Sequence, residues 1–212
     1  MNGREKMKRY WWVLLTGLLI LVTGVAPALG ANTNPNNYVV GKLGFYTPTS
    51  NDLSGYDTGF NTEVAFGHYF TPNIALEAGI GYFRTEGDVT VVDQGGFTFR
   101  ADERIEVMPF TVSLRASVPI NVWLEIYAIG GIGAYYVYDR IEVDHHNHHH
   151  DDHISDDKTE FGWHLGGGLN YNISRNFFVG VEVKYVWVSA NLFGQDVNLS
   201  GVRGTGNFGF RF

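Results

Sequence analysis

The residues best suited to chemistry in this 212-residue chain are six histidines within one short acidic stretch. Neutral imidazole is the commonest protein ligand for zinc, copper and nickel, and neighbouring carboxylates add oxygen ligands and negative potential. We therefore expect the stretch to capture divalent zinc, nickel or copper, although its spacing does not define one tetrahedral site. The candidate ligands are Asp144, His145, His146, His148, His149, His150, Asp151, Asp152 and His153.

A second interpretation of this stretch is a solvated low-complexity loop that captures metal without a dedicated role. Residues 139–160 contain eight acidic and two basic residues, a net charge of −6 with neutral histidine. Because imidazole must be deprotonated to bind metal, we expect uptake to weaken steeply below about pH 6.

Other reactive groups are scarce. The chain has no cysteine, which excludes disulfides and thiolate chemistry. It has no nucleophile elbow and no convincing Ser-His pairing, so we expect neither an enzyme nor a required cofactor. Its formal net charge of −7 argues against a nucleic-acid partner, which favours basic surfaces.

The first thirty residues resemble a targeting segment. Four basic residues within the first nine precede an apolar run over residues 10–26, and small residues follow at 28–30. This order predicts a signal peptide over 1–30 that is cleaved on export, followed by a polar periplasmic lead-in over 31–37. The alternative is a retained anchor helix, because the run is nearly long enough to span a bilayer.

The remaining chain, residues 38–212, alternates in hydropathy with a period of two, which indicates β-strands. In each segment bulky apolar residues keep to one phase, whereas charged residues and most glycines keep to the other. Low charge content, 17%, together with 27 glycines and 15% aromatic residues also favours β structure. The eight segments are 39–45, 60–67, 74–82, 110–118, 124–136, 163–171, 179–187 and 202–212.

Nine charges lie on the charged phase. A soluble ligand-binding barrel shows the same alternation with its apolar phase inward. Nine charges on eight strands are too sparse for a water-exposed wall, and Arg or Lys facing lipid would cost about 2–4 kcal/mol at the bilayer midplane. We therefore expect the apolar phase to face lipid and the charges to form an ion-pair core in a narrow lumen. They are Lys42, Glu63, Glu77, Arg115, Glu125, Glu182, Lys184, Arg203 and Arg211.

The connections between segments alternate strictly in length, as in outer-membrane barrels. Short turns are expected near residues 70–72, 119–121 and 172–176. Long connections are expected near residues 47–58, 85–103, 139–160 and 189–200. An even number of strands closes the sheet without a free edge. The sequence thus predicts an all-β, eight-stranded antiparallel up-and-down transmembrane β-barrel.

Aromatic residues near the segment ends predict two interfacial girdles. Tyr46, Phe60, Tyr82, Tyr136, Trp163 and Trp187 lie toward the long connections, and Tyr69, Phe70, Trp123, Tyr171, Phe177 and Phe212 lie toward the turns.

The run from Leu43 to Gly87 (LGFYTPTSNDLSGYDTGFNTEVAFGHYFTPNIALEAGIGYFRTEG) and the ending NFGFRF resemble the outer-membrane β-barrel domain family, which includes the OmpA-like, OmpX-like and OmpW-like proteins. The resemblance implies residence in the outer membrane of a Gram-negative bacterium, with outer-membrane lipid and lipopolysaccharide as surroundings. It also implies that Phe208, Phe210 and Phe212 form the signal read by the barrel assembly machinery. The family is functionally mixed, so the match says little about activity.

An eight-stranded barrel has an interior about wide enough for its own side chains, which argues against a general porin. We therefore expect a structural or surface-interaction role, with a possible extracellular partner bound through the loops. The alternative is an OmpW-like narrow passage for a small hydrophobic or ionic solute. A hydrophobic route requires an apolar upper lumen, for which the candidates are Phe83, Ile129, Tyr135 and Val137.

Overall fold

The computed structural model describes residues 36–53, 55–92, 98–142, 154–192 and 195–212. The predicted signal peptide, most of the lead-in and the His-rich stretch lie outside the described residues. Within the described part of the chain, no helix is both long enough and apolar enough to cross a membrane.

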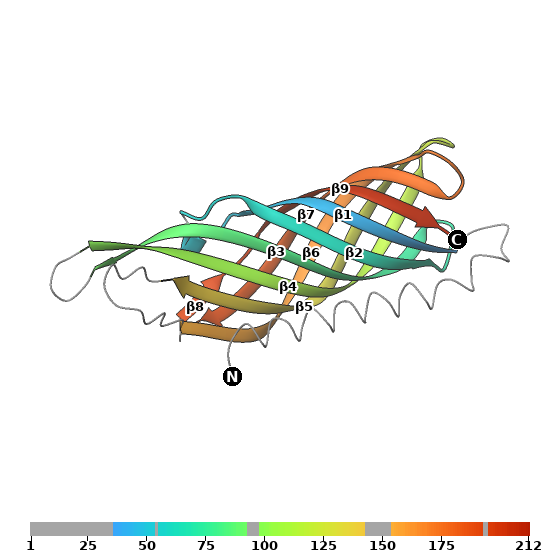
Figure 1. Cartoon of the computed structure of the whole chain (residues 1–212). Coiled ribbons are helices and arrows are strands. Elements are labelled where there is room, and N and C mark those ends of the chain that lie inside the picture. The colour runs from blue at the N-terminus through green and yellow to red at the C-terminus, as the bar shows by residue number, and fades with distance from the viewer. Residues whose placement is uncertain (1–35, 54, 93–97, 143–153, 193–194) are drawn as a thin grey trace. The chain divides into compact units, whose positions relative to one another are not determined.

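Nine strands and one short 3₁₀ helix make up the described chain (Figure 1). The strands are β1 (Asn37–Pro48), β2 (Gly59–Tyr69), β3 (Ile74–Val92), β4 (Thr98–Pro119), β5 (Leu124–Glu142), β6 (Ile154–Asn172), β7 (Phe177–Leu192), β8 (Gln195–Asn198) and β9 (Gly201–Arg211), and the helix is η2 (Asn51–Leu53).

All neighbouring strands are antiparallel, and the sheet closes on itself. Sequential strands from β1 to β7 pair in order, β7 pairs with β9, and β9 pairs with β1. The short β8 pairs with β7 from Ser189 to Leu192, beyond the part of β7 that pairs with β9. Strands β8 and β9 therefore share the eighth position in the barrel, and β8 does not add a ninth. The predicted closed, eight-stranded antiparallel barrel is confirmed.

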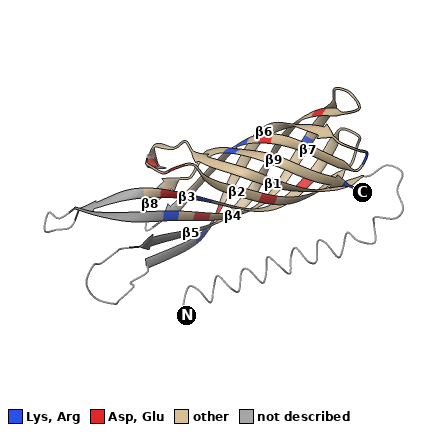
Figure 2. Ribbon diagram, turned by 45° about the horizontal axis from the view of Figure 1, so that its top comes forward, with Lys and Arg blue, Asp and Glu red and all other residues tan. Residues whose placement is uncertain are grey.

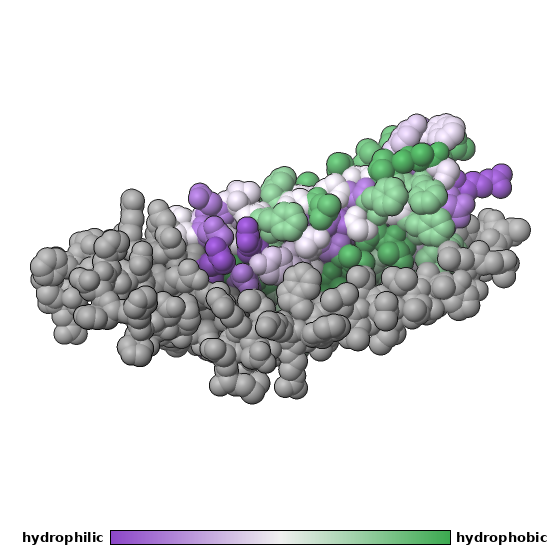
Figure 3. Space-filling view, viewed as in Figure 1, coloured by the Kyte–Doolittle hydropathy of each residue, from purple (hydrophilic) through white to green (hydrophobic). Residues whose placement is uncertain are grey.

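The pleat separates two kinds of side chain. Residues of the charged phase point into the lumen, and residues of the apolar phase lie on the outer wall, where hydrophobic residues gather on the described part of the surface in view (Figure 3). Charges are sparse along the strands (Figure 2). The exposed apolar side chains include Leu43, Leu76, Phe110, Leu114, Ile132, Leu165 and Val183.

Three tight turns close one end of the barrel, here called the turn end, and they share one architecture. The side-chain oxygens of Thr71, Asn121 and Ser174 each accept hydrogen bonds from the backbone N–H groups of the residues two and three positions later. Such side-chain-to-backbone bonds are the reason that Thr, Asn and Ser favour turns. These turns coincide with the three short connections expected from the sequence.

At the opposite end, here called the loop end, the strands are longer than the alternation predicted. Of the segments expected as long connections, residues 85–92, 98–103, 139–142 and 154–160 are strand, because β3 and β4 pair up to Val92↔Thr98 and β5 and β6 up to Ile141↔Ile154. The sequence criterion required a charge-free phase. It failed here because Arg84 and Glu86 are charged and point outward, while Phe83 points inward.

The β1–β2 connection folds across the loop end. The backbone N–H of Asp57 donates to the carbonyl of Glu86, and Thr49 donates to the carbonyl of Ser200. Leu53, which belongs to η2 within this connection, is buried. The two connections flanking β1 and β9 therefore meet over the barrel mouth.

Two aromatic residues assigned to the girdles lie inside the barrel instead. Tyr46 is 1% exposed and donates a hydrogen bond to the carbonyl of Leu199, 2.6 Å away. Tyr69 packs against Tyr38, with ring centroids 5.4 Å apart. Both belong to the inward phase of their strands, so the girdle prediction was wrong for them because it used position along the strand without phase.

Candidate functional site

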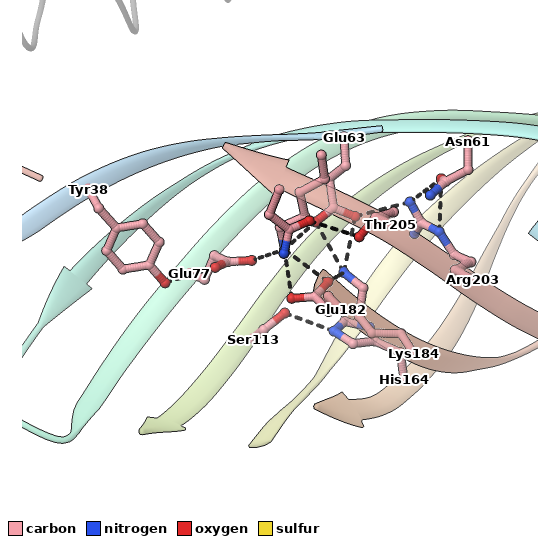
Figure 4. A network of polar contacts seen from close by, with 12 residues as sticks. Tyr38, Asn61, Glu63, Glu77, Ser113, His164, Glu182, Lys184, Arg203 and Thr205 are labelled. Atoms are coloured by element: carbon pink, nitrogen blue, oxygen red, sulfur yellow. Dashed lines mark hydrogen bonds and ion pairs between the residues drawn. The ribbon is translucent and has the colours of Figure 1, made fainter. Parts of the chain in front are cut away.

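Six buried charges from five strands form one network in the middle of the lumen (Figure 4). Lys42 lies at its centre, with its Nζ 2.6 Å from Glu77, 3.0 Å from Glu63 and 3.2 Å from Glu182. We call this network the charged layer. Its members are Lys42, Glu63, Glu77, Glu182, Lys184 and Arg203.

The charged layer is electrically balanced. The Nζ atom of Lys184 lies 3.1 Å from both Glu63 and Glu182, and a guanidinium nitrogen of Arg203 lies 3.1 Å from Glu63. Three cations thus face three carboxylates, and every member is at most 3% exposed. Buried ions are tolerated only when they are paired and hydrogen-bonded, and this geometry satisfies that requirement.

Neutral side chains complete the network. The hydroxyl of Tyr38 donates to Glu77 at 2.8 Å, and the hydroxyl of Tyr127 donates to Glu182 at 2.9 Å. Asn207 donates to the Tyr127 hydroxyl at 3.2 Å. These hydrogen-bond partners were not predicted from the sequence. The available signal was that all three residues occupy the inward phase of their strands.

A second group of charges lies nearer the turn end. One guanidinium nitrogen of Arg115 is 2.7 Å from Glu125, and Arg211 is 3.4 Å from the same carboxylate. The guanidinium carbon of Arg115 lies 3.7 Å from the ring centroid of Tyr127, a cation–π contact. The nine predicted lumenal charges therefore separate into a balanced layer of six and a turn-end group of three.

The structure also brings together a Ser-His pair that was not expected. Ser113 Oγ lies 2.8 Å from His164 Nε2. Both residues are buried within the lumen, at 3% and 2% exposure, so neither faces water or lipid. The pair joins β4 to β6 across the interior and lies away from any rim where a substrate would bind.

Above the charged layer, toward the loop end, the lumen becomes apolar. Tyr46, Phe83 and Tyr135 line it, and Leu53 and Leu199 belong to the connections at the mouth. We call this group the upper apolar cluster. Its buried members are Tyr46, Leu53, Phe83, Ile105, Val107, Tyr135, Val137, Val186, Val188, Ala190 and Leu199.

The predicted metal ligands from Asp144 to His153 lie outside the described residues. Within the described ranges, no group of three or more His, Cys, Asp or Glu side chains is arranged to hold a metal ion.

The predicted assembly signal lies on β9 and directly after it. Phe208 is 57% exposed on the outer wall. Its ring and that of Phe210 lie 6.0 Å and 4.9 Å from the ring of Phe177 on β7. Phe212 follows the end of β9 at Arg211.

A closed barrel with an apolar outer wall and ion pairs enclosed within it has the design of a membrane-spanning β-barrel. The chain belongs to the outer membrane protein beta-barrel domain family, whose model matches residues 16–212. It is therefore an outer-membrane β-barrel protein. No functionally curated protein matches the chain.

Solved structures support the same fold. Neisserial surface protein A is 14% identical with a TM-score of 0.53, and the match covers 84% of this chain and 97% of that one. OprG from Pseudomonas aeruginosa is 16% identical with a TM-score of 0.54, covering 84% and 97%. A major outer membrane protein from Thermus thermophilus is 12% identical with a TM-score of 0.54, covering 83% and 98%. At these identities the similarity concerns the fold alone.

Proposed function

We propose that the protein is a barrel closed to ions that has a structural or surface-interaction role in the outer membrane of a Gram-negative bacterium. The charged layer carries this proposal, because Lys42, Glu63 and Glu182 meet in the middle of the lumen at hydrogen-bonding distances. An ion crossing the barrel would have to break these pairs in a region of low dielectric, where unpaired charges are costly. An extracellular partner would then bind through the loop end.

Conductance in planar bilayers tests this proposal. The purified barrel, inserted alongside a parallel preparation of a known open porin, is expected to give no steady current. The Lys42→Ala/Glu77→Ala double variant removes one pair of the layer and leaves its net charge unchanged. It is expected to leak more than the wild-type barrel. A steady open channel from the wild-type protein would contradict the proposal.

The His-rich stretch supplies the second part of the proposal, capture of divalent zinc, nickel or copper at the loop end. Composition supports it, since residues 144–153 contain six imidazoles and three carboxylates. Pairing of Ile141 with Ile154 also brings both ends of this segment to one place on the rim. The capture would serve metal retention at the surface and would require no cofactor for folding.

Zinc titration of the refolded barrel at pH 7.5 and pH 5.5 tests the metal proposal. Affinity is expected to fall at least tenfold at the lower pH, because protonated imidazole cannot bind metal. A matched variant with all six loop histidines changed to alanine is expected to lose the pH-dependent component. Equal affinity at the two pH values, or no effect of the six substitutions, would contradict it.

Passage of a small hydrophobic solute is the second candidate function, and the upper apolar cluster favours it. Phe83, Tyr135 and Val137 are buried members of that cluster, whereas Ile129, also expected there, is buried outside it. The charged layer lies beneath the cluster. The test is the rate at which an apolar dye is released from vesicles that contain the barrel. If the barrel is closed, this rate is expected to equal that of vesicles without protein, and if the barrel is a passage, the rate is expected to be higher.

Lipid, lipopolysaccharide and the barrel assembly machinery are the partners that we infer from the outer wall and the last strand. Phe208 and Phe210 would present their aromatic rings to the machinery together with Phe212. Changing all three to serine is expected to reduce the barrel recovered in outer-membrane fractions without affecting refolding into detergent. An undiminished yield in membranes would contradict this assignment.

A further inference from the structure

The upper part of β6 is an edge of the sheet. β6 pairs with β5 as far as Ile154, opposite Ile141, whereas its pairing with β7 ends at Gly162, opposite Val188. Beyond Val188, β7 pairs with β8, on the side of β7 that β9 occupies lower down. Among the described residues, the segment over 154–161 therefore has a strand neighbour on one side only. We call this segment the β6 edge.

Alternate residues of the β6 edge offer their backbone groups to a further strand. In an antiparallel pair, residues that exchange both backbone hydrogen bonds alternate with residues that exchange none. The N–H of Asn172 donates to the carbonyl of Trp123 beside β5, and the register between β5 and β6 is constant up to Ile154. Even-numbered residues of β6 therefore point N–H and C=O toward β5. The residues of the edge that point theirs away from β5 are Ser155, Asp157, Thr159 and Phe161.

The β6 edge lies in water and not in lipid. A backbone group without a partner is costly in hydrocarbon, so each lipid-covered strand needs a neighbour on both sides. The sequence agrees with this position, because residues 154–160 (ISDDKTE) contain four charged residues and no aromatic one. The edge thus stands above the bilayer at the loop end, where a soluble partner has access to it.

The chain covers the other side of the same extension. On β3, Gly87 forms a bridge with Tyr56 of the β1–β2 connection, and the carbonyl of Glu86 accepts a hydrogen bond from the N–H of Asp57, 2.8 Å away. No described segment makes such backbone contacts with the β6 edge on its β7 side. Within the described chain, β6 is therefore the side of this extension that is open to another strand.

Charge along the β6 edge favours a basic occupant. Three acidic residues, Asp156, Asp157 and Glu160, face one basic residue, Lys158, a net charge of −2. A second copy of this chain does not fit. β6 runs from the loop end to the turn end in every barrel inserted in the same direction, so antiparallel pairing of two β6 edges would need one barrel inverted.

The lower end of the β6 edge is aromatic. Phe161 is 82% exposed, and Trp163, which is 52% exposed, stacks on Trp187 with ring centroids 3.8 Å apart. An antiparallel occupant starts at this end and runs toward Ile154. Its first residues therefore meet aromatic rings, and its later residues meet the acidic part of the edge.

We propose that the β6 edge binds an extended, basic segment of a partner protein by adding it to the sheet as an antiparallel strand. The backbone groups of Thr159 and Phe161 pair with the backbone of that segment, which gives affinity, and the acidic residues select lysine or arginine. This proposal rests on the surface-interaction role proposed above and specifies how the partner is held.

Binding of an octapeptide to the barrel in lipid nanodiscs tests the proposal. The sequence Tyr-Lys-Val-Thr-Lys-Lys-Thr-Val places its lysines opposite Glu160, Asp157 and Asp156 in antiparallel register. Fluorescence anisotropy of the dye-labelled peptide measures saturable binding, and amide hydrogen exchange at Thr159 and Phe161 is expected to slow in the complex. A peptide with glutamate in place of each lysine is expected to bind at least about tenfold more weakly.

Backbone methylation separates strand addition from electrostatic attraction alone. In the antiparallel register, the third and seventh residues of the peptide point their N–H groups at Thr159 and Ser155. N-methylation of these two residues is expected to weaken binding about tenfold or more, the value of two hydrogen bonds. N-methylation of the fourth and sixth residues, whose N–H groups point away from β6, is the matched control and is expected to have no effect.

Thr159→Pro is the corresponding change in the barrel. Proline removes the N–H and obstructs a neighbouring strand, but it is tolerated on the edge of a sheet. We expect peptide binding to weaken about tenfold or more, whereas Thr159→Val, which keeps the N–H, is expected to bind like the wild-type barrel. Both variants are expected to keep the wild-type thermal stability, because the N–H of Thr159 points away from β5.

No saturable binding of the peptide, or equal binding by Thr159→Pro and Thr159→Val, would overturn the proposal and mean that the charges of the β6 edge only keep other strands away. Planar-bilayer conductance of the same preparation tests the proposed function separately. A steady current together with normal peptide binding would contradict the closed barrel and leave the β6 edge standing. A silent barrel that binds no peptide would do the reverse.

Discussion

The lower and upper parts of the barrel use the same strands in opposite ways. On β3, Leu76 faces outward and Glu77 inward near the turn end, whereas Arg84 faces outward and Phe83 inward near the loop end. The lower wall is therefore apolar outside and charged inside. On β3 and β4 the upper wall carries charged side chains such as Arg84 and Arg104 outside and apolar ones such as Phe83 and Ile105 inside, as in a water-soluble barrel.

This reversal shows that the solvent outside the wall, and not the strand itself, decides which phase is apolar. Where lipid covers the wall, outward charges are costly and the interior is free to hold ion pairs. Where water covers it, outward charges such as those of Arg104 and Glu86 pair at the surface, 2.9 Å apart. The interior is then stabilised by apolar burial, at about 25 cal/mol per Å².

The largest effect that would test this comparison is loss of one carboxylate from the charged layer. Glu63 faces Lys42, Lys184 and Arg203, so Glu63→Gln leaves three buried cations against two carboxylates. We expect the free energy of unfolding to fall by about 3–5 kcal/mol. Urea titration of the barrel in lipid vesicles, followed by tryptophan fluorescence, measures it.

The control for that variant is Glu86→Gln on the outer wall of the upper region. Its pair with Arg104 is half exposed, and such pairs contribute about 0.2–1 kcal/mol. Equal losses from Glu63→Gln and Glu86→Gln would mean that the charged layer is hydrated and contributes no more than a surface pair.

A smaller effect is expected from an arginine placed on the outer wall. Val183 is 57% exposed in the middle of the lower wall, and Ser189 is exposed six residues further along the same strand and phase. Val183→Arg is expected to cost about 2–4 kcal/mol, and Ser189→Arg about 0–1 kcal/mol. Refolding equilibria in vesicles compare the two variants, and a cost at Ser189 equal to that at Val183 would place lipid around the upper wall as well.

The smallest effect is expected at the boundary of the upper apolar cluster. Tyr46→Phe removes the hydrogen bond to the carbonyl of Leu199 and keeps the ring against Phe83, whose centroid lies 4.4 Å away. We expect a loss of about 1 kcal/mol. Amide hydrogen exchange near Leu199 is expected to accelerate while exchange at the turn end stays constant. Uniform acceleration along the barrel would show that the mouth and the lower wall open together.

The lower barrel could be predicted from the sequence because one rule governs it. A charge-free phase repeats in every lipid-covered segment, so residues such as Leu114 and Arg115 could be assigned to the outside and the inside. The upper barrel could not, since that rule fails once the outer wall is wetted. Arg84 and Glu86 then look like loop residues although they belong to β3.

The contacts within the lumen were beyond prediction for a different reason. Alternation tells which side chains point inward but not the stagger between strands, and the stagger decides which of them meet. Lys42 could have paired with several carboxylates, and its contact with Glu182 spans 140 residues of sequence. The hydroxyl of Tyr127 reaches the same glutamate from β5. Such pairs follow only from the closed, tilted cylinder.

The seam between the first and last strands limits how this protein can be made. Strand β1 pairs with β9 from Tyr38↔Arg211 to Pro48↔Gly201, so β1 finds one of its two neighbours only when β9 is available. Until then two open edges would invite pairing with other chains. A polypeptide cut short before Gly201 lacks β9 and leaves the cylinder unsealed, so the barrel can close only after β9 has been made.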